Sequence, residues 1–316
     1  ALDNGIGFIV VDSLDEMALL EGMAAERGER QRILLRITPG VEAHTHHYIQ
    51  TGQLDSKFGF GLAEGHAVAA IRRALDSPHL ELVGLHAHIG SQIFELEGFR
   101  RAIAILVDLI KETYDRYGFE CRYLNVGGGL GIRYTGEDTP VTIDQYVAGK
   151  IESVRDEMAR VGLPVPRILV EPGRSIVAKA GLTAYHVGSI KEVPGIRTYV
   201  SVDGGMSDNM RPMLYDAVYE AMIADRACAP AHTVVTVAGK HCESSDILIK
   251  DATIAQPRVG DILVTPVTGA YCFSMASNYN GNPRPAVLLV NDGRARVIVE
   301  RESYADLVAR QRPLHG

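Results

Sequence analysis

The stretch YLNVGGGLG, residues 123–131, joins a short apolar run to a cluster of glycines. The same order, an apolar run followed by polar or glycine residues, recurs in LVGLHAHIGS (residues 82–91) and ILVEPGR (residues 168–174). Two earlier apolar runs, residues 7–12 and 33–37, complete the series. Apolar runs of this length are typical of buried parallel strands. The sequence therefore predicts a parallel sheet whose strands carry functional groups at their carboxyl ends.

Amphipathic stretches separate the apolar runs, and their apolar spacing predicts helices near residues 14–27, 64–75, 98–117 and 143–161. Ser13 is expected to cap the first helix, with Glu16 as its capping-box partner. Chemistry at five strand ends favours a (β/α)8 barrel over a doubly wound sheet, which concentrates its chemistry at one switch point. Residues 1–180 are predicted to form such a barrel. Because five of eight units are visible, we expect it to be N-terminally incomplete, with about 90 to 100 residues preceding Ala1.

The pattern changes after residue 180, where short runs rich in Val, Ile and Thr alternate with turn signals. Residues 181–316 are therefore predicted to form a C-terminal β domain, so the fold class is α/β plus all-β. The predicted strands are residues 185–190, 198–203, 233–238, 261–265, 286–291 and 295–301.

Composition limits the function classes. Hydrophobic residues make up 46% and charged residues 22% of the 316 residues, as in a soluble globular protein. The net charge of −7 argues against nucleic acid or an anionic membrane as the main partner. No apolar run approaches the roughly 18 residues that span a bilayer, and the first residues do not resemble a signal peptide. Four scattered cysteines without CxxC spacing fit a reducing compartment, and we predict a cytoplasmic protein.

The glycine cluster Gly127-Gly128-Gly129 could hold a phosphate, because glycines let backbone amides approach an anion and a following helix start would favour negative charge. A tight turn explains these residues equally well. Ser91 follows another strand and could donate its hydroxyl to the same phosphate. His88 could stack on a cofactor ring, although a core histidine is the commoner explanation. His86 is expected to point to the other side of the strand and to serve the structure.

Residues 171–174, EPGR, supply a carboxylate and a guanidinium after a further strand. A carboxylate such as Glu171 can keep a pyridine nitrogen protonated, which turns the ring into an electron sink. Arg174 can bind a carboxylate or phosphate through two parallel hydrogen bonds. An ordinary surface ion pair is the competing explanation.

The second half contributes further candidates. Cys242 and Glu243 lie in the polar segment KHCESSD, residues 240–246, which could equally be a turn with a buried cysteine. A zinc site with His44, His46 and His47 is a weak alternative, since the spacing lacks HExxH or CxxC, and we predict no metal. Tyr271 could reach a phosphate. Arg211 and Tyr215, four residues apart, could present a cation and a phenol on one helix face.

Six segments in this order carry a family resemblance: HIGSQ, GGGLG, EPGR, VDGGMSDNMRPMLY, GKHCESSD and GAYCFSMASNYN. Together they resemble the alanine-racemase-like decarboxylases that use pyridoxal 5'-phosphate (PLP), and among these the diaminopimelate decarboxylases. The resemblance extends over nearly the whole chain. It implies decarboxylation of meso-2,6-diaminopimelate to L-lysine, and a homodimer with shared active sites.

The resemblance also implies roles for single residues. Three roles concern the cofactor ring and the reacting carbon: stacking by His88, pairing with the ring nitrogen by Glu171, and proton donation by Cys242. Cys242 and Glu243 are expected to serve the partner's site, with Glu243 binding the distal amino group. The phosphate is expected at Ser91, Gly127, Gly128, Gly129 and Gly173, the substrate carboxylates at Arg174, Arg211 and Tyr215, and both ligands at Tyr271.

One family feature has no match in these 316 residues. The resemblance implies a Schiff-base lysine in an AxKAN-like motif on an early barrel strand, and none of the lysines lies in that context. We therefore expect the segment with this lysine to be missing and the chain alone to be inactive. Two alternatives remain: a related PLP decarboxylase of another amino acid or polyamine precursor, and a non-catalytic homologue or fragment.

Overall fold

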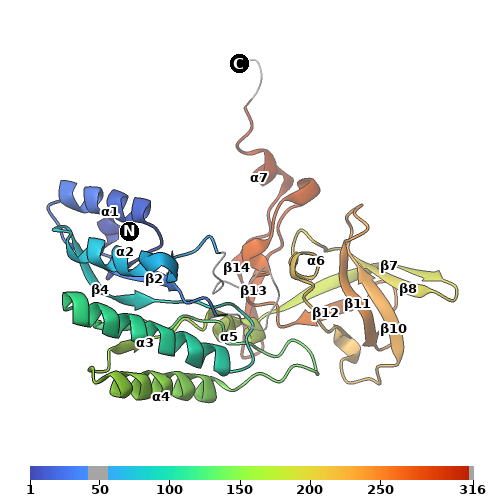
Figure 1. The fold of residues 1–316 in the computed structure, drawn as a ribbon. Coiled ribbons are helices and arrows are strands. Elements are labelled where there is room, and N and C mark those ends of the chain that lie inside the picture. Colours follow the sequence, from blue (N-terminus) through green and yellow to red (C-terminus); the bar gives the residue numbers. More distant parts are fainter. Residues whose placement is uncertain (42–55, 313–316) are drawn as a thin grey trace. The chain divides into compact units, whose positions relative to one another are not determined.

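The computed structural model describes residues 1–41 and 56–312. The chain divides into two compact units, each of which is described by itself. The first unit consists of Ala1–Arg133 and Thr139–Ser175, and the second of Tyr134–Asp138 and Ile176–Gly316. Figure 1 shows the helices and strands of both units.

The first unit is built on a parallel sheet with the strand order β1-β2-β4-β5-β6, and the short strand β3 pairs in parallel with β2. All five predicted strands are present, with ends shifted by no more than two residues. The strands are β1 (Ile9–Val11), β2 (Gln31–Thr38), β3 (Phe60–Gly61), β4 (Leu80–His86), β5 (Tyr123–Asn125) and β6 (Arg167–Leu169).

Helices follow the strands in the predicted order. The α-helices are α1 (Leu14–Glu26), α2 (His66–Leu75), α3 (Glu97–Tyr117), α4 (Ile143–Val161) and the short α5 (Gly173–Val177), with 3-10 turns at Leu2–Asn4 and Ala63–Gly65. Ser13 caps α1 by accepting a hydrogen bond from the Glu16 amide. The expected reciprocal bond is different: the Glu16 carboxylate accepts from the amide of Asp12 rather than from that of Ser13.

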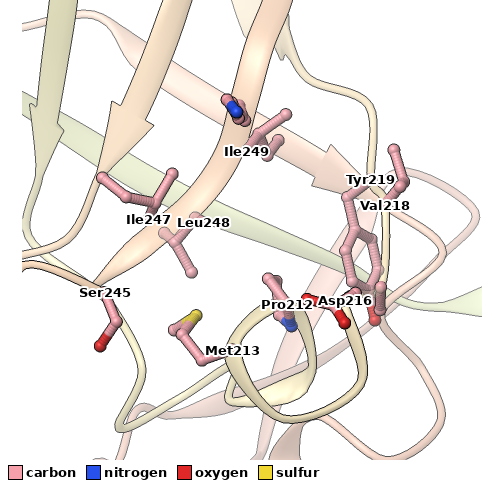
Figure 2. Close-up of a pocket in the computed structure, with 11 residues that line it drawn as sticks. Pro212, Met213, Asp216, Val218, Tyr219, Ser245, Ile247, Leu248 and Ile249 are labelled. Atoms are coloured by element: carbon pink, nitrogen blue, oxygen red, sulfur yellow. The ribbon is translucent and has the colours of Figure 1, made fainter. Parts of the chain in front are cut away.

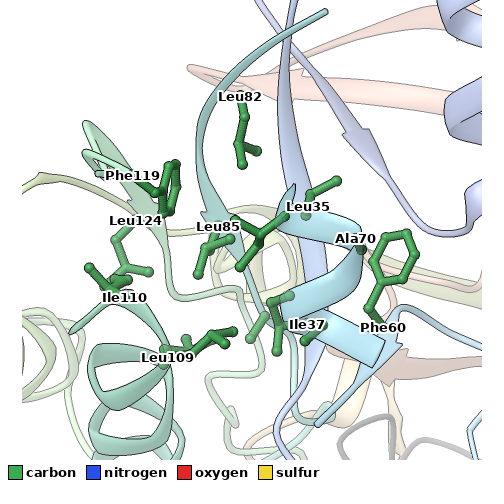
Figure 3. Close-up of a cluster of buried hydrophobic side chains, with 14 of the residues drawn as sticks. Leu35, Ile37, Phe60, Ala70, Leu82, Leu85, Leu109, Ile110, Phe119 and Leu124 are labelled. Atoms are coloured by element: carbon green, nitrogen blue, oxygen red, sulfur yellow. The ribbon is translucent and has the colours of Figure 1, made fainter. Parts of the chain in front are cut away.

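The core of the first unit lies between the sheet and its helices. Figure 3 shows Leu35, Leu85 and Leu124, one from each of β2, β4 and β5, together with Leu109 and Ile110 of α3. All five are buried. Because the strands are apolar on both faces, they are typical of a parallel sheet that is covered rather than exposed to water.

The second unit contains a mixed six-stranded sheet with the order β11-β10-β8-β7-β12-β9, and a separate hairpin of β13 and β14. Its strands are β7 (Leu182–Val193), β8 (Arg197–Val202), β9 (Met222–Ile223), β10 (Thr233–Ala238), β11 (Ile247–Ile254), β12 (Ile262–Pro266), β13 (Val287–Asn291) and β14 (Arg294–Val299). Two short helices, α6 (Arg211–Tyr215) and α7 (Tyr304–Val308), accompany them. Further 3-10 turns are Ala178–Ala180, Ala224–Arg226, Phe273–Met275 and Tyr279–Gly281.

The strand prediction for this unit missed β9 and β11. In β11 the polar pair Lys250-Asp251 interrupts the apolar pattern, and Asp251 has a φ of 54°, in the left-handed region. The register between β10 and β11 shifts near Val237 as well. An irregular strand of this kind does not alternate with a strict period of two, so periodicity does not detect it.

The fold class is as predicted: parallel strands alternating with helices form part of a (β/α)8 barrel, and a β domain follows in the sequence. None of the helices in residues 1–41 and 56–312 combines the length and the apolar character that a membrane crossing requires.

Candidate active site

The glycine loop after β5 packs directly against the ends of two neighbouring strands. A Cβ atom on Gly128 would lie 2.1 Å from the carbonyl oxygen of Glu171, and one on Gly129 would lie 2.4 Å from that of Gly90. Only glycine permits this approach. The loop therefore brings together the segments that follow β4, β5 and β6, as the strand-end pattern predicted.

The predicted helix N-terminus, which would favour a bound anion at this loop, is not found there. No helix begins directly after Gly131, because α4 starts only at Ile143. The expectation of a helix N-terminus next to the glycines is therefore wrong, and any anion at this loop must be held by the backbone amides and nearby side chains.

Glu171 is held as a carboxylate by two side chains. His86 Nε2 lies 3.4 Å from Glu171 Oε2, and Asn125 Nδ2 donates to Oε1 over 2.8 Å. The contact with His86 is the main cause that lowers the pKa of Glu171 to about 2, against a desolvation that raises it. A carboxylate with this pKa is ionised at neutral pH and can accept a hydrogen bond from a protonated ring nitrogen.

His86 was assigned the wrong direction from the sequence. Residues two apart on a strand share a face, and the buried His86 ring of β4 faces Glu171 rather than the opposite side. His86 and Asn125 are thus residues of the candidate site that sequence reasoning missed. The even spacing between His86 and His88 was the signal that could have identified the first of them.

His88 follows β4 and is half-buried. Its Nδ1 accepts a hydrogen bond of 3.2 Å from the Gly128 amide. Burial is the first cause that lowers the pKa of His88 to about 4, and the charge of Arg36 is the second. His88 is therefore a neutral aromatic ring at physiological pH, attached to the glycine loop.

Ser91 and Arg174 lie together in the same unit. Arg174 is buried and its Nη2 donates to Ser91 Oγ over 2.8 Å. The candidate residues of the first unit thus belong to segments that adjoin one another at the carboxyl ends of β4, β5 and β6, and the last two of them begin α5. They are His88, Ser91, Gly127, Gly128, Gly129, Glu171, Gly173 and Arg174.

In the second unit, Arg211 is buried at the start of α6. Its Nη1 donates to the hydroxyl of Tyr219, and its guanidinium lies 4.8 Å from the ring centre of Tyr134. Tyr215 ends the same short helix, so the two lie on one helical face as predicted. A pocket of about 420 Å³ lies between α6 and β11, and Tyr219 is one of its lining residues (Figure 2). Arg211 and Tyr215 are not among its lining residues.

Cys242 and Glu243 lie in the loop between β10 and β11. The Cys242 thiol is exposed and lies 3.7 Å from Glu243 Oε1. Tyr279 donates a hydrogen bond to the same carboxylate oxygen, and this bond is the main cause that lowers the pKa of Glu243. Tyr279 belongs to the segment GAYCFSMASNYN, but its contact with a residue 36 positions away could not be derived from spacing.

The loop that carries Cys242 is anchored by Asp246. This buried carboxylate accepts hydrogen bonds from the amides of Met206 (2.7 Å) and His241 (2.9 Å). It also lies so close to Gly239 that a Cβ there would be 2.1 Å from the carboxylate. The two segments VDGGMSDNM and GKHCESSD are therefore joined through one side chain.

Tyr271 has a φ of 63° and an exposed side chain. A non-glycine residue with positive φ is uncommon and occurs often at functional sites. His44, His46 and His47, the weak zinc candidates, lie outside the described residues. Within residues 1–41 and 56–312, no group of three His, Cys, Asp or Glu side chains is arranged to hold a metal ion.

Comparison with known proteins identifies the class of enzyme. Residues 1–178 match the family model described as pyridoxal-dependent decarboxylase, pyridoxal binding domain. The carboxy-lyase class predicted from the motifs is thus confirmed. The diaminopimelate decarboxylase of Bacillus subtilis is 52% identical over 308 residues, which are 98% of this chain and 70% of that protein. The enzyme of Mycobacterium tuberculosis (strain H37Rv) is 44% identical over 98% of this chain and 71% of its own length. The chain belongs to the diaminopimelate decarboxylase family.

Solved structures agree with this assignment. Diaminopimelate decarboxylase from M. jannaschii in complex with L-lysine has a TM-score of 0.89 at 35% identity, covering 99% of this chain and 70% of that chain. The Helicobacter pylori enzyme in complex with L-lysine has a TM-score of 0.87 at 35% identity, covering 98% and 74%. A lysine/ornithine decarboxylase from Vibrio vulnificus shares the fold, with a TM-score of 0.71 at 23% identity over 89% and 68%.

Proposed function

We propose that this protein decarboxylates meso-2,6-diaminopimelate to L-lysine with PLP as its cofactor. The observation that carries the proposal is the pairing of the glycine loop with an ionised Glu171, fixed by His86 and Asn125. The named activity of the relatives and the L-lysine in two similar structures support the same substrate and product.

The residues of the first unit fit PLP chemically. A cradle that any Cβ would fill suits close approach of a phosphate to backbone amides. We assign the phosphate to Gly127, Gly128 and Gly129 together with Ser91 and Gly173. When bound, PLP supplies a protonated ring that withdraws electrons from the reacting carbon.

Glu171 and His88 would have different roles toward the bound ring. Glu171, with a pKa of about 2, keeps its negative charge and holds a proton on the ring nitrogen. His88 is neutral because burial lowers its pKa to about 4, so its flat ring can stack without adding a positive charge that would oppose ring protonation.

Substrate binding is assigned to charged and phenolic side chains. Arg174, Arg211 and Tyr215 bind carboxylates, and Tyr271 contacts both cofactor and substrate. Glu243 binds the distal ammonium, for which its lowered pKa is suitable. Cys242 Sγ donates a proton to the carbon that has lost carbon dioxide, as a general acid.

Three further features belong to this proposal: the oligomeric state, the domain bounds and the location in the cell. Cys242 and Glu243 serve the site of a second subunit, so the working form is a homodimer. Residues 1–180 and 181–316 are the two proposed domains, and the cytoplasmic location inferred from the cysteines stays a prediction.

The test is carbon dioxide release by the full-length protein from meso-diaminopimelate, L-lysine, L-ornithine and L-arginine in parallel. We expect turnover of meso-diaminopimelate at least 100-fold above the others, because buried polar groups reject analogues that leave them unpaired. Preferred turnover of L-ornithine or L-arginine would replace the substrate assignment with the related-decarboxylase alternative. If the PLP-loaded protein decarboxylates none of the four amino acids, the non-catalytic homologue is favoured.

A further inference from the structure

Lys150 of α4 is buried directly behind the glycine loop. Its ammonium Nζ donates to the carbonyl oxygens of Val126 (2.7 Å) and Gly127 (3.1 Å) and to the hydroxyl of Tyr146 (2.6 Å). The side chain is 1% exposed. Lysine is almost never this deeply buried unless it is paired with an acid, and none of the described carboxylates lies within ion-pairing distance of Lys150.

Tyr146, one helical turn before Lys150, extends the same contact. Its hydroxyl donates to the carbonyl oxygen of Gly128 over 2.8 Å and lies 3.3 Å from that of Gly127. The rings of Phe99 and Tyr146 lie 4.2 and 4.3 Å from the ammonium and enclose it. Three consecutive carbonyl groups of the loop are therefore held by two side chains of α4.

This arrangement sets the direction of the loop amides. In a trans peptide the C=O and the following N–H point in opposite directions. Because the carbonyl of Gly128 points to α4, the amide of Gly129 points away from it. The Gly128 amide, on the far side of the Gly127 carbonyl, is directed to His88. The Gly129 amide has no acceptor among the residues that the structure describes.

The Gly127 amide donates to Asn125 Oδ1 over 3.0 Å, and the Gly128 amide to His88 Nδ1 over 3.2 Å. We propose that Lys150 and Tyr146 are positioning residues that hold the carbonyl oxygens of residues 126–128, so that the Gly129 amide faces the phosphate of the cofactor. The positive charge behind the loop also complements a bound dianion, in place of the helix N-terminus that this loop lacks. The inference rests on the proposed PLP function and extends it to two residues that do not touch the ligand.

A bound phosphate would also affect the ammonium. Burial is the first cause that lowers the pKa of Lys150 to about 7, and the charge of Glu171 partly opposes it. The phenol of Tyr146, whose pKa burial raises, contacts the ammonium, and His88 is close enough for the charge of Lys150 to help lower the pKa of its ring. A dianion placed at the loop favours the charged form of Lys150.

The experiment compares Kd values of PLP and of pyridoxal, which lacks the phosphate, for apo full-length protein by fluorescence titration. The variants are Tyr146→Phe and Lys150→Met, and Ser153→Ala is the control, because it removes a hydroxyl from α4 that bonds only the helix carbonyl of Gly149. We expect weaker binding of PLP by about fivefold for Tyr146→Phe and by about 10- to 100-fold for Lys150→Met, from the loss of neutral and charged hydrogen bonds. Binding of pyridoxal should change less than twofold, and Ser153→Ala should bind both ligands like the parent protein.

Equal weakening of PLP and pyridoxal would overturn the proposal, because the pair would then only support the fold. Unchanged PLP binding in Tyr146→Phe would overturn it as well, and that isosteric variant decides the matter if Lys150→Met does not fold. A parent protein that binds PLP no better than pyridoxal would also reject it. Failure of the proposed function would differ: the phosphate preference would be intact while meso-diaminopimelate is not turned over.

Discussion

The two units hold their candidate residues in different ways. In the first unit the site is made of backbone and of side chains that are held by buried partners: the glycine loop, the exposed Glu171 with its buried partners His86 and Asn125, and the buried pair on α4. In the second unit, Cys242 and Tyr271 are exposed, and Glu243 is held by exposed contacts with Tyr279 and Cys242.

This difference suggests that cofactor binding and catalysis depend on different units. Buried networks cost much free energy when one partner is removed, and they hold a ligand group in a fixed geometry. Exposed side chains contribute little to stability, so they are free to serve a reacting substrate. The first unit is therefore expected to determine most of the cofactor affinity, and the exposed Cys242 of the second unit the turnover number.

The largest effect that would test this division is expected for Cys242→Ala. Loss of a general acid lowers kcat by about 10²- to 10⁴-fold, while the Kd for PLP should stay within twofold of the parent value. Steady-state kinetics and a fluorescence titration measure the two quantities. Cys228→Ala is the matched control, since Cys228 is the other exposed cysteine of the described residues in that unit.

The opposite result would break the division between the units. If Cys242→Ala weakens PLP binding as much as it lowers kcat, the loop between β10 and β11 belongs to the cofactor site. If kcat is unchanged, Cys242 is not the proton donor.

A smaller effect is expected from His88 when pH changes. The folded protein keeps His88 neutral down to a pKa of about 4, whereas in the unfolded chain it accepts a proton near pH 6.5. Stability should therefore fall as pH decreases from 6.5 to 4, with no contribution above 6.5. The loss attributable to His88 is at most about 3 kcal/mol.

Urea unfolding at pH 7 and pH 4.5 measures this loss, and His88→Phe should reduce it because phenylalanine does not titrate. The exposed His232 provides the control variant, His232→Phe, which should lose stability with pH like the parent protein. A pH dependence that is the same in His88→Phe and in the parent would show that His88 is not desolvated in the folded state.

Regular elements were predictable from the sequence where local signals agreed. The bounds of α4 match the prediction because its apolar spacing is regular and Thr142 and Gln145 form a capping box at its start. The strand β11 was missed because Asp251, with positive φ, interrupts its pattern. Local periodicity contains no information about such a bulge.

The part of the site that could be predicted from the sequence consists of the glycine, glutamate and arginine residues that follow the strands. The residues that support them, such as Lys150 and Asn125, could not be predicted, and the reason differs for each. Lys150 lies four residues after Tyr146 on an amphipathic helix, where a lysine is normally a surface residue. Asn125 lies inside an apolar run, and its contact with Glu171 joins two strands that are far apart in the sequence.

The smallest effect is expected for Tyr279→Phe, which removes the hydrogen bond to Glu243 and leaves the ring next to His241, 5.4 Å away. The contact is exposed, so its loss should change the stability of the fold little. We expect KM for meso-diaminopimelate to rise about two- to fivefold with kcat unchanged, because Glu243 is assigned to binding. Steady-state kinetics check this, with Tyr304→Phe on α7 as an exposed control. A fall in kcat without a change in KM would instead place Tyr279 and Glu243 with Cys242 in proton transfer.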